Sequence, residues 1–519
     1  MSASPGSDHH VHGKDIFLLL LLTAAAILVH GYHPFVEDAE IYVPGIKQAL
    51  HPSLYPYNAG FFASHAHLTL FPNLIAASAR ITHLPIDWVL FAWHFFSIFL
   101  LLLGCWHVGR LCFRDTRARW GGVALVASLL TIPVAGTALY MMDQYVNTRS
   151  LSTPAVLFIL INVLERKFVR AGLWAVATAA IHPLMVVFGV SYVVLLWWTQ
   201  RRHETQSVPY TAVLLPLGLF PPVTGAYREV MESHSYFFLL RWEWYEWLGI
   251  FGPLLLLWWF SRIARKQGLS LMDALCRSLI GFGLLFFAVA VVITVPARFA
   301  NLAELQPMRS LQLIYVLLFV MIGGLAAQFW FKNHLWRWLL VFVPLSSGMG
   351  FAQLQLFPAT SHIEWPGTPS GNEWVQTFDW IRQNTPNDAY FALDPEHMEL
   401  PGEDQHGFRA IAERSMLADR IKDSGAVTMF PALAETWQQQ EQAQSGWKSF
   451  QKPDFERLNR QFGVTWVVLE NPANLTDCPY HNRTLAVCRI DYRLAYLCAL
   501  SVLGGEAFDS PIATPAASA

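Results

Sequence analysis

Long apolar runs recur along the chain, and they constrain its fold more than any other feature. A run of about 20 apolar residues can cross a bilayer as a helix. Of the 519 residues, 54% are hydrophobic and only 14% are charged, against about 25% charged in a typical soluble protein. The sequence therefore predicts a polytopic α-helical membrane protein with about eleven transmembrane helices. The expected segments are 15–30, 86–108, 121–140, 151–164, a broken pair within 171–198, 212–226, 248–260, 279–295, 311–331 and 335–357.

Basic residues predict how these segments are oriented. Arg and Lys accumulate in cytoplasmic loops, and they follow the segments that end near residues 108 and 164. Lys14 before the first segment and acids after it favour a cytoplasmic N-terminus. An odd number of crossings then places the C-terminus outside the cytoplasm, with residues 31–84 as a long first external loop.

The polar C-terminal part has a different pattern. Residues 372–383 show helical periodicity, and 389–393 and 464–469 are β-branched and aromatic with turn residues around them, as in strands. This predicts a small external α/β domain, in which Cys478 and Cys488 can form a disulfide. The expected organisation is a disordered tail 1–14, a membrane domain 15–360, the α/β domain 361–500 and a disordered tail 501–519.

Residues 171–198 are too long for one ordinary span and have basic residues at both ends. His182-Pro183 interrupts them near the middle, and Pro removes a helical hydrogen bond. We therefore expect two half-helices that turn at His182. Broken helices are tolerated where protein or a water-filled cavity satisfies the freed backbone, so His182 is expected beside a cavity.

Three carboxylates, those of Glu37, Asp38 and Glu40, lie where the first apolar segment ends. Carboxylates near hydrocarbon are costly and are often functional, although solvation of a loop is the simpler alternative. The predicted topology brings further polar residues to the same side. The candidate catalytic residues are Asp38 and Glu37, and the candidate substrate- or lipid-phosphate-binding residues are Arg149, His182, Arg309, Asp143, Glu40 and Tyr42.

This residue set suits transfer of a sugar from a lipid phosphate to a hydroxyl. A carboxylate can remove the hydroxyl proton, and the planar fork of Arg matches phosphate oxygens. Structural roles stay open for several members. Asp143 can pair with Arg149, both Arg side chains can snorkel, and His182 can serve only the helix break. Tyr42 can be an interfacial aromatic residue.

Several stretches resemble the GT-C glycosyltransferases, which are multi-pass enzymes, and in particular a poorly characterised bacterial branch. They are 37–44, 54–56, 149–154, 182–185 and 306–309. The resemblance implies a polyprenyl-phosphate-linked sugar donor, a glycan, lipid or protein acceptor, and Asp38 or Glu37 as catalytic base. It implies a bacterial inner membrane with a periplasmic C-terminal domain. Some members bind a divalent metal through a second acidic motif, but Asp143 stands alone here without a DxD pair.

Two other function classes remain as alternatives. Broken helices and intramembrane charges also occur in transporters, so a flippase or transporter for a lipid-linked substrate is the main rival. The sequence shows no internal repeat that would favour it. A binding or assembly module without catalysis is the second. The net charge of −2 gives no indication of a nucleic-acid partner.

Overall fold

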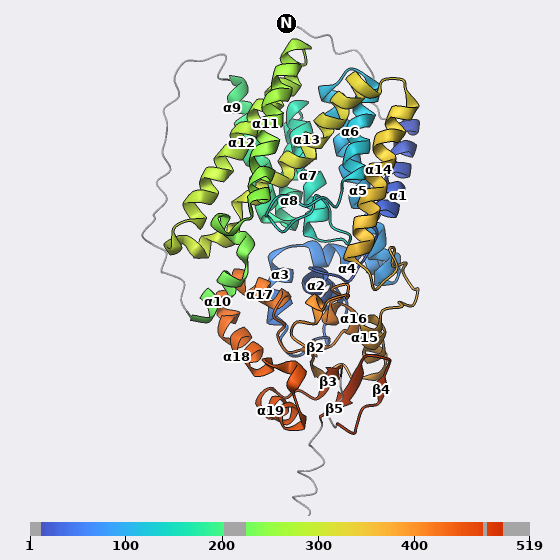
Figure 1. Cartoon of the computed structure of the whole chain (residues 1–519), viewed down its shortest axis with the longest axis vertical. Helices are drawn as coiled ribbons and strands as arrows, with labels where there is room; N and C mark the ends of the chain where they lie inside the picture. The colour runs from blue at the N-terminus through green and yellow to red at the C-terminus, as the bar shows by residue number, and fades with distance from the viewer. Residues whose placement is uncertain (1–11, 202–224, 471–474, 491–519) are drawn as a thin grey trace, which may run out of the picture.

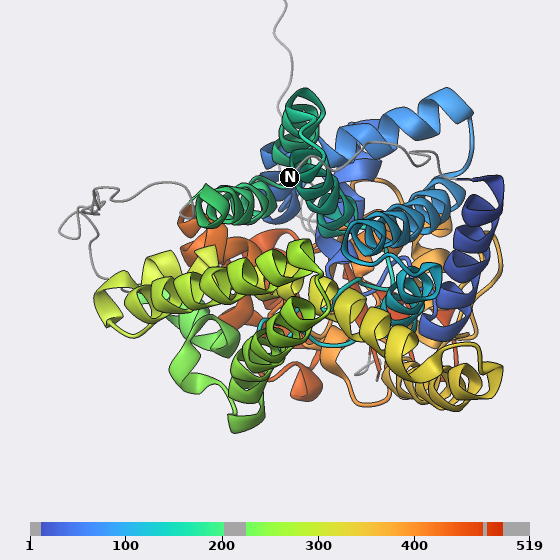
Figure 2. The same ribbon diagram turned by 90° about the horizontal axis from the view of Figure 1, so that it is seen from above.

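A computed structural model describes residues 12–201, 225–470 and 475–490. It consists of a helical bundle at the top of Figure 1, an α/β domain at the bottom, and a layer of short helices between them. The bundle contains α1 (Gly13–His30), α5 (Ile86–Cys112), α6 (Thr116–Ser128), α7 (Thr148–Leu164), α8 (Phe168–Ile181), α9 (Pro183–Arg201), α11 (Trp244–Lys266), α12 (Ser270–Thr294), α13 (Leu311–Ala326) and α14 (Leu335–Leu356). Helices α11 and α12 pack against each other, and the view from above in Figure 2 shows both at one side of the bundle.

Six helical stretches in the described residues are long and apolar enough to cross a membrane. They are Gly13–His30, Ile86–Cys112, Trp244–Lys266, Ser270–Thr294, Phe299–Phe331 and Leu335–Leu356. Helices α7, α8 and α9 are apolar but shorter. A membrane-embedded helical protein is thus supported, whereas the expected count of eleven crossings is not confirmed. Most of the segment expected over 212–226 lies outside the described residues, as do residues 1–11 and 491–519 of the two expected tails.

The segment expected over 121–140 is only partly helical. Helix α6 ends at Ser128, and the chain continues to Asn147 as a loop in which Pro133 forms an isolated bridge with Tyr140. Pro133 lacks an N–H and cannot continue a helix without losing a hydrogen bond. Ala135 and Ala138 adopt positive φ, which is costly for residues with a Cβ. This loop turns back on itself instead of crossing the bundle.

The expected break at His182 is present. Helix α8 ends at Ile181 and α9 begins at Pro183, and His182 between them has the extended angles φ −153° and ψ 91°. The N–H of Leu70 donates to the carbonyl of Ala180 over 2.8 Å. The reversal therefore rests on the intermediate layer, and α9 runs back from it toward the top of Figure 1.

The expected first loop, 31–84, is largely helical. It forms α2 (Ala39–Leu50), α3 (Gly60–Leu68) and α4 (Phe71–Thr82), which lie between the bundle and the α/β domain together with α10 (Gly225–Ser233) (Figure 1). Val43 and Ile46 on α2 are buried against Phe71 and Ile75 on α4. These apolar positions recur at helical spacing, so the loop folds as helices that cover the end of the bundle.

The C-terminal domain has a five-stranded sheet in the order β2-β1-β3-β5-β4. Strand β1 is parallel to β2 and β3, whereas β5 is antiparallel to β3 and β4. The expected strands are present as β1 and β3, and Cys478 is disulfide-bonded to Cys488. The strands are β1 (Tyr390–Ala392), β2 (Ser415–Met416), β3 (Trp466–Leu469), β4 (Tyr480–His481) and β5 (Ala486–Arg489). The helices are α15 (Glu373–Asn384), α16 (Phe408–Ala412), α17 (Lys422–Met429), α18 (Ala434–Gln444) and α19 (Lys452–Phe462).

Backbone hydrogen bonds join the segment after α1 to this domain. The N–H of Glu37 donates to the carbonyl of Gln405 over 3.1 Å, and the N–H of Gly407 donates to the carbonyl of Phe35 over 2.9 Å. Residue 407 must be small, because a Cβ there would collide with the carboxylate of Glu40. The chain that carries the acidic cluster is therefore held by the C-terminal domain.

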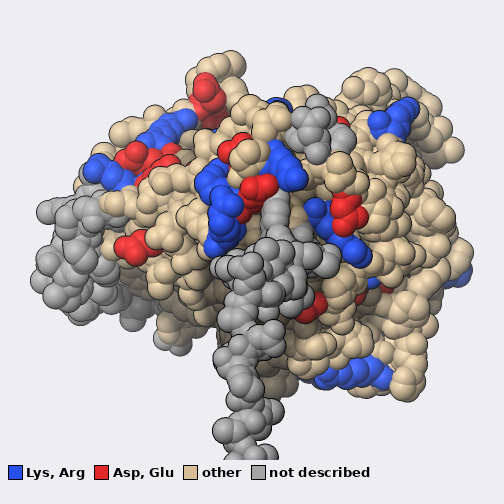
Figure 3. Space-filling model, turned by 90° about the horizontal axis from the view of Figure 1, so that it is seen from below, with Lys and Arg blue, Asp and Glu red and all other residues tan. Residues whose placement is uncertain are grey.

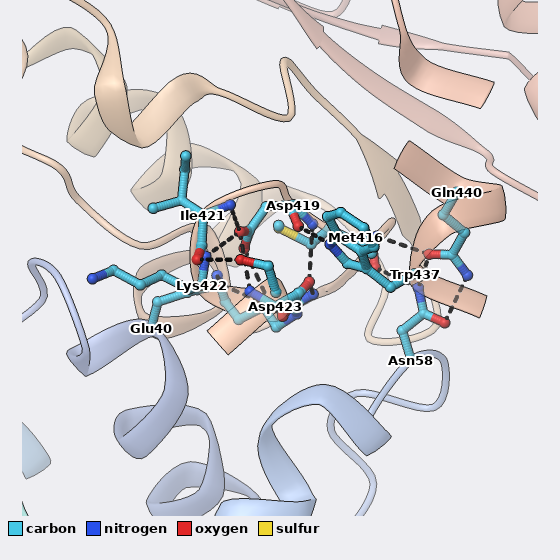
Figure 4. A network of polar contacts seen from close by, with 12 residues as sticks. Glu40, Asn58, Met416, Asp419, Ile421, Lys422, Asp423, Trp437 and Gln440 are labelled. Carbon is cyan, nitrogen blue, oxygen red and sulfur yellow. Dashed lines mark hydrogen bonds and ion pairs between the residues drawn. The ribbon is translucent and has the colours of Figure 1, made fainter. Parts of the chain in front are cut away.

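A buried ion network also connects the start of α2 to the C-terminal domain (Figure 4). Glu40 accepts hydrogen bonds from the backbone N–H groups of Arg409 and Ala410 at 3.0 and 2.9 Å. The Arg409 guanidinium contacts Glu40 at 3.3 Å and binds both oxygens of Asp423 at 2.9 and 2.6 Å. We call Glu40, Arg409, Asp419 and Asp423 the interdomain network. All four are buried.

A second polar cluster predicts pH-dependent stability. Glu364, between α14 and the α/β domain, contacts His33 at 2.8 Å and His406 at 3.2 Å. Burial raises the pKa of Glu364, but the two His side chains outweigh it and lower that pKa from 4.5 to about 2. Burial lowers the pKa of His406, but Glu364 outweighs it and the net direction is upward.

The stabilisation from Glu364 is therefore lost as pH falls below its ordinary pKa of 4.5 toward 2. That from His406 is present below the ordinary pKa of 6.5 and is lost as pH rises through its raised pKa. Both contributions are fully present between the two ordinary pKa values, 4.5 for Glu364 and 6.5 for His406. We therefore expect Glu364→Gln to lower the melting temperature most between pH 4.5 and pH 6.5, and to make the melting temperature depend less on pH. The matched control is Glu435→Gln, at an exposed position of α18, which should leave the profile unchanged. Parallel profiles for wild type and Glu364→Gln would contradict this.

Candidate functional site

A cavity of about 800 Å³ lies between the bundle and the C-terminal domain. The loop after α6, the start of α7 and the turn before α13 line it from the bundle, and residues before and within α17 line it from the domain. Five of the eight candidate residues line it, namely Glu37, Asp38, Asp143, Arg149 and Arg309. The cavity lies at the end of the bundle that carries the domain.

Asp38 is held between two cations from different parts of the fold. Its Oδ2 accepts a hydrogen bond from Arg149 over 3.1 Å, and its Oδ1 accepts one from Lys422 over 3.2 Å. Its backbone N–H donates to the hydroxyl of Tyr145 over 3.2 Å. The Asp38 side chain is nevertheless 31% exposed, so both cations orient a carboxylate that a ligand can reach.

Electrostatics keeps Asp38 ionised. Burial alone would raise its pKa, but Lys422 and Arg149 outweigh burial and hold the pKa well below its ordinary value of 3.8. Burial also disfavours the charged form of Lys422, but Glu37 and Asp38 raise its pKa above 10.5. A carboxylate paired with cations remains charged. Asp38 is therefore ionised at neutral pH.

Glu37 is the second carboxylate that contacts Lys422. It adopts the left-handed conformation with φ 55°, which a residue with a Cβ takes up at a cost. Its carboxylate contacts Lys422 at 2.6 Å and is 34% exposed. The strained turn directs Glu37 and the following Asp38 toward the same Lys.

Arg149 is positioned by the N-terminus of α7. Asn147 caps the helix by accepting the N–H of Ser150 over 3.0 Å, as side chains at this position commonly do. Arg149 contacts Asp143 at 3.0 Å as well as Asp38, and Asp143 also accepts a hydrogen bond from Asn147 over 2.6 Å. The structural alternative for Asp143, an ion pair with Arg149, is thus present, and Asp143 orients the Arg.

Arg309 lies in the turn Pro307–Ser310 just before α13. The structure gives it no ion pair with any described Asp or Glu, although Asp38 and Arg149 act on it electrostatically. The Nε–H groups of Arg149 and Arg309 are both buried without a hydrogen-bond acceptor among the described residues. Buried polar groups are normally satisfied. Two such donors beside one cavity indicate a place for an anionic ligand.

The other three candidates have different environments. Glu40 belongs to the interdomain network and not to the cavity wall. The Tyr42 hydroxyl lies 3.4 Å from Thr148 at the start of α7, and its ring packs edge-on against Phe71. His182 does not line the cavity, although Arg149 and Arg309 are among its electrostatic neighbours. These residues surround the site without facing it.

Lys422 is the site residue that the sequence analysis missed. It begins α17, where Asp419 caps the helix by accepting the N–H groups of Ile421 and Lys422 at 2.8 and 2.5 Å. Its neighbour Asp423, labelled beside it in Figure 4, binds Arg409 at 2.6 Å. The start of α17 therefore contributes one residue to the cavity and one to the interdomain network. No local pattern distinguishes this Lys from others in the polar C-terminal domain.

No protein-family model matches the chain, and no curated protein shows significant similarity to it. Among the described residues, no three His, Cys, Asp or Glu side chains gather in a metal-binding arrangement. The geometry of the cavity is therefore the basis for assigning its function.

Proposed function

We propose that this protein is a membrane glycosyltransferase that moves a sugar from a polyprenyl-phosphate donor to an acceptor hydroxyl. The observation that carries the proposal is an ionised carboxylate, Asp38, in the same cavity wall as Arg149 and Arg309. Both Arg residues have a buried Nε–H without an acceptor. The resemblance of the sequence motifs to GT-C enzymes supports the same reaction.

In the proposed reaction, the acceptor oxygen attacks the anomeric carbon of the donor. The bond from that carbon to the phosphate oxygen breaks, and its electron pair leaves with the phosphate. Asp38 takes the proton of the attacking hydroxyl as general base. Arg149, Arg309 and Lys422 stabilise the charge on the departing phosphate. No redox partner is needed.

The position of the cavity favours this reaction over transport. The residues that line it come from the ends of α7 and α13, the segment after α1 and the C-terminal domain. Alternating-access transporters bind their substrates near the middle of the bilayer. A cavity at one end of the bundle suits a donor whose phosphate and sugar leave the bilayer while its polyprenyl chain stays in it. A periplasmic site also agrees with the disulfide between Cys478 and Cys488, because disulfides persist in oxidising compartments.

The proposal is tested by donor binding to the protein in lipid nanodiscs. A polyprenyl phosphate and its hexosyl derivative should each raise the melting temperature, because a ligand that binds only the folded state stabilises it. Arg309→Ala should abolish this shift, since its removal deprives the phosphate of a cation. The substitution breaks no ion pair with an Asp or Glu among the described residues.

The matched control is Arg228→Ala, because Arg228 is an exposed residue of α10 that pairs with Glu232 and does not line the cavity. It should retain the full stabilisation. A farnesyl alcohol probe tests whether the phosphate is required. Equal stabilisation of wild type and Arg309→Ala, or no stabilisation of folded wild type by either phosphate, would contradict the proposed donor site.

A further inference from the structure

A second cavity, of about 500 Å³, lies beside the segment that carries Asp38. Pro34 and Phe35 line this cavity, whereas Glu37 and Asp38 line the first. The rest of its wall comes from the start of α5, the linker 364–370, α15, Ile411 in α16 and Tyr480 in β4. Its volume is within the ~300–1,000 Å³ of small-molecule sites.

Aromatic rings form one part of the wall. Trp380 stacks on Tyr480 with their ring centroids 4.9 Å apart and an interplanar angle of 22°. Trp365 also lines the cavity and is 48% exposed. The faces of aromatic rings carry partial negative charge, which attracts the polarised C–H groups on one face of a pyranose ring.

Hydrogen-bonding side chains form the other part. Asp87, in the first turn of α5, has a buried Oδ1 without a hydrogen-bond partner among the described residues. Gln376 and Gln383 on α15 are exposed at the cavity. Buried acceptors are normally satisfied, and the hydroxyl groups of a sugar are donors that would satisfy Asp87.

The charged side chains of this cavity restrict the charge of the ligand that it can bind. The carboxyl and basic side chains of the wall are those of Asp87, Glu364, Asp379 and Arg382. Arg382 already pairs with Asp379 at 2.8 Å, and Glu364 contacts His33 and His406. Asp87 is then a carboxyl group of the wall without an ion pair among the described residues, and no unpaired cation faces it. An anionic ligand would be repelled. Beyond the cavity, the visible part of the domain's lower face shows acidic and basic side chains next to one another (Figure 3). The preference for an uncharged or cationic ligand is thus a property of the cavity.

We propose that this second cavity binds a neutral or amino saccharide, which, if the proposed glycosyl transfer holds, is part of the acceptor. The acceptor is then a glycan. Its sugar unit stacks on Trp380 and donates to Asp87, and an adjoining unit presents the hydroxyl to Asp38. The segment 34–38 contributes residues to both cavities. Binding of the glycan at Pro34 and Phe35 would therefore affect the position of Asp38 through the backbone between them.

The test is saturation-transfer NMR on the full chain in nanodiscs with five probes, namely cellobiose, maltose, mannobiose, chitobiose and glucosamine. At least one is expected to bind. Asp87→Asn should weaken binding about tenfold or more, as expected for loss of a hydrogen bond to a charged group. Trp380→Leu should do the same through loss of stacking. Asp388→Asn, at an exposed turn position of the same domain, should bind like wild type.

Donor binding separates the two proposals. Arg309→Ala should bind the saccharide as wild type does while losing the response to polyprenyl phosphate. Donor binding without binding of any saccharide would overturn the second site and leave the first intact. Saccharide binding unchanged in both Asp87→Asn and Trp380→Leu would also overturn it. So would binding of trilysine in place of every saccharide, since the ligand would then be a cationic peptide.

Discussion

Asp38→Asn is expected to reduce sugar transfer by about 10²–10⁴-fold, the usual contribution of a general base. Asn has the same shape, so it can keep one hydrogen bond to Arg149 or Lys422, but it cannot accept the proton of the acceptor hydroxyl. Transfer is measured in nanodiscs from a radiolabelled polyprenyl-phosphate hexose, with native membranes as the source of acceptor. Stabilisation by the donor should persist, because the Arg residues that bind its phosphate remain.

Glu37→Gln is the matched control for this prediction. Glu37 shares Lys422 with Asp38 but contacts no described Arg, and at 34% exposure its ion pair is expected to contribute only ~0–1 kcal/mol. Transfer should then fall less than about tenfold. The opposite order, with a large loss in Glu37→Gln and a small one in Asp38→Asn, would identify Glu37 as the base. Full activity in both would exclude the acidic pair from catalysis.

The sequence predicts well those features that depend on local chemistry. His182-Pro183 predicts a helix break because Pro lacks a donor, and the break occurs there. The aromatic residues of 389–393 and the β-branched residues of 464–469 predict β1 and β3, since both runs are bounded by turn residues. The structural alternative for Asp143, pairing with Arg149 six residues later, is also present, with Asp143 in the loop before α7 and Arg149 in its first turn. Each of these predictions needs only a few consecutive residues.

Features that depend on distant contacts escape prediction. Lys422 meets Asp38 across more than 380 positions of the chain, and nothing near Lys422 in the sequence indicates that contact. Glu40 was expected at the substrate because it lies two residues from Asp38, but one half-turn of helix points it to Arg409 instead. The sequence predicts a loop over 31–84, whereas the structure has helices there. These helices bury their apolar residues against each other, so they lack the long apolar runs by which membrane helices are recognised. Tertiary packing decides all three.

The interdomain network carries the second prediction of large effect. Arg409→Met is expected to lower the free energy of unfolding by ~3–5 kcal/mol, since removing one partner of a buried ion pair leaves the other groups without compensation. Here the groups left without their partner are the carboxyl groups of Glu40, Asp419 and Asp423, all of them buried. Met approximates the length and volume of the Arg side chain, so the loss is one of charge and hydrogen bonds more than of packing.

The pH dependence of this loss has a defined sign. Burial raises the pKa of Glu40 and of Asp423, and Arg409 is the main group that opposes the rise. Without Arg409 both carboxyl groups take up protons more readily in the folded state, so their raised pKa values make stability fall as pH increases. The difference in melting temperature between wild type and Arg409→Met should therefore be larger at pH 8 than at pH 6.

Two further variants test whether the loss of stability is specific to the interdomain network. One removes an Arg elsewhere, and the other also removes a carboxyl partner of Arg409. Arg420→Met removes an exposed Arg, paired with the exposed Glu396, from the loop before α17, and should change stability by less than about 1 kcal/mol. Adding Glu40→Gln to Arg409→Met removes one of the buried carboxyl groups that have lost their partner, and it should restore part of the melting temperature. Because α17 carries both Asp423 and Lys422, Arg409→Met should also lower sugar transfer by displacing Lys422 from Asp38. Equal melting temperatures for Arg409→Met and Arg420→Met would show that the network does not hold the domain against the bundle.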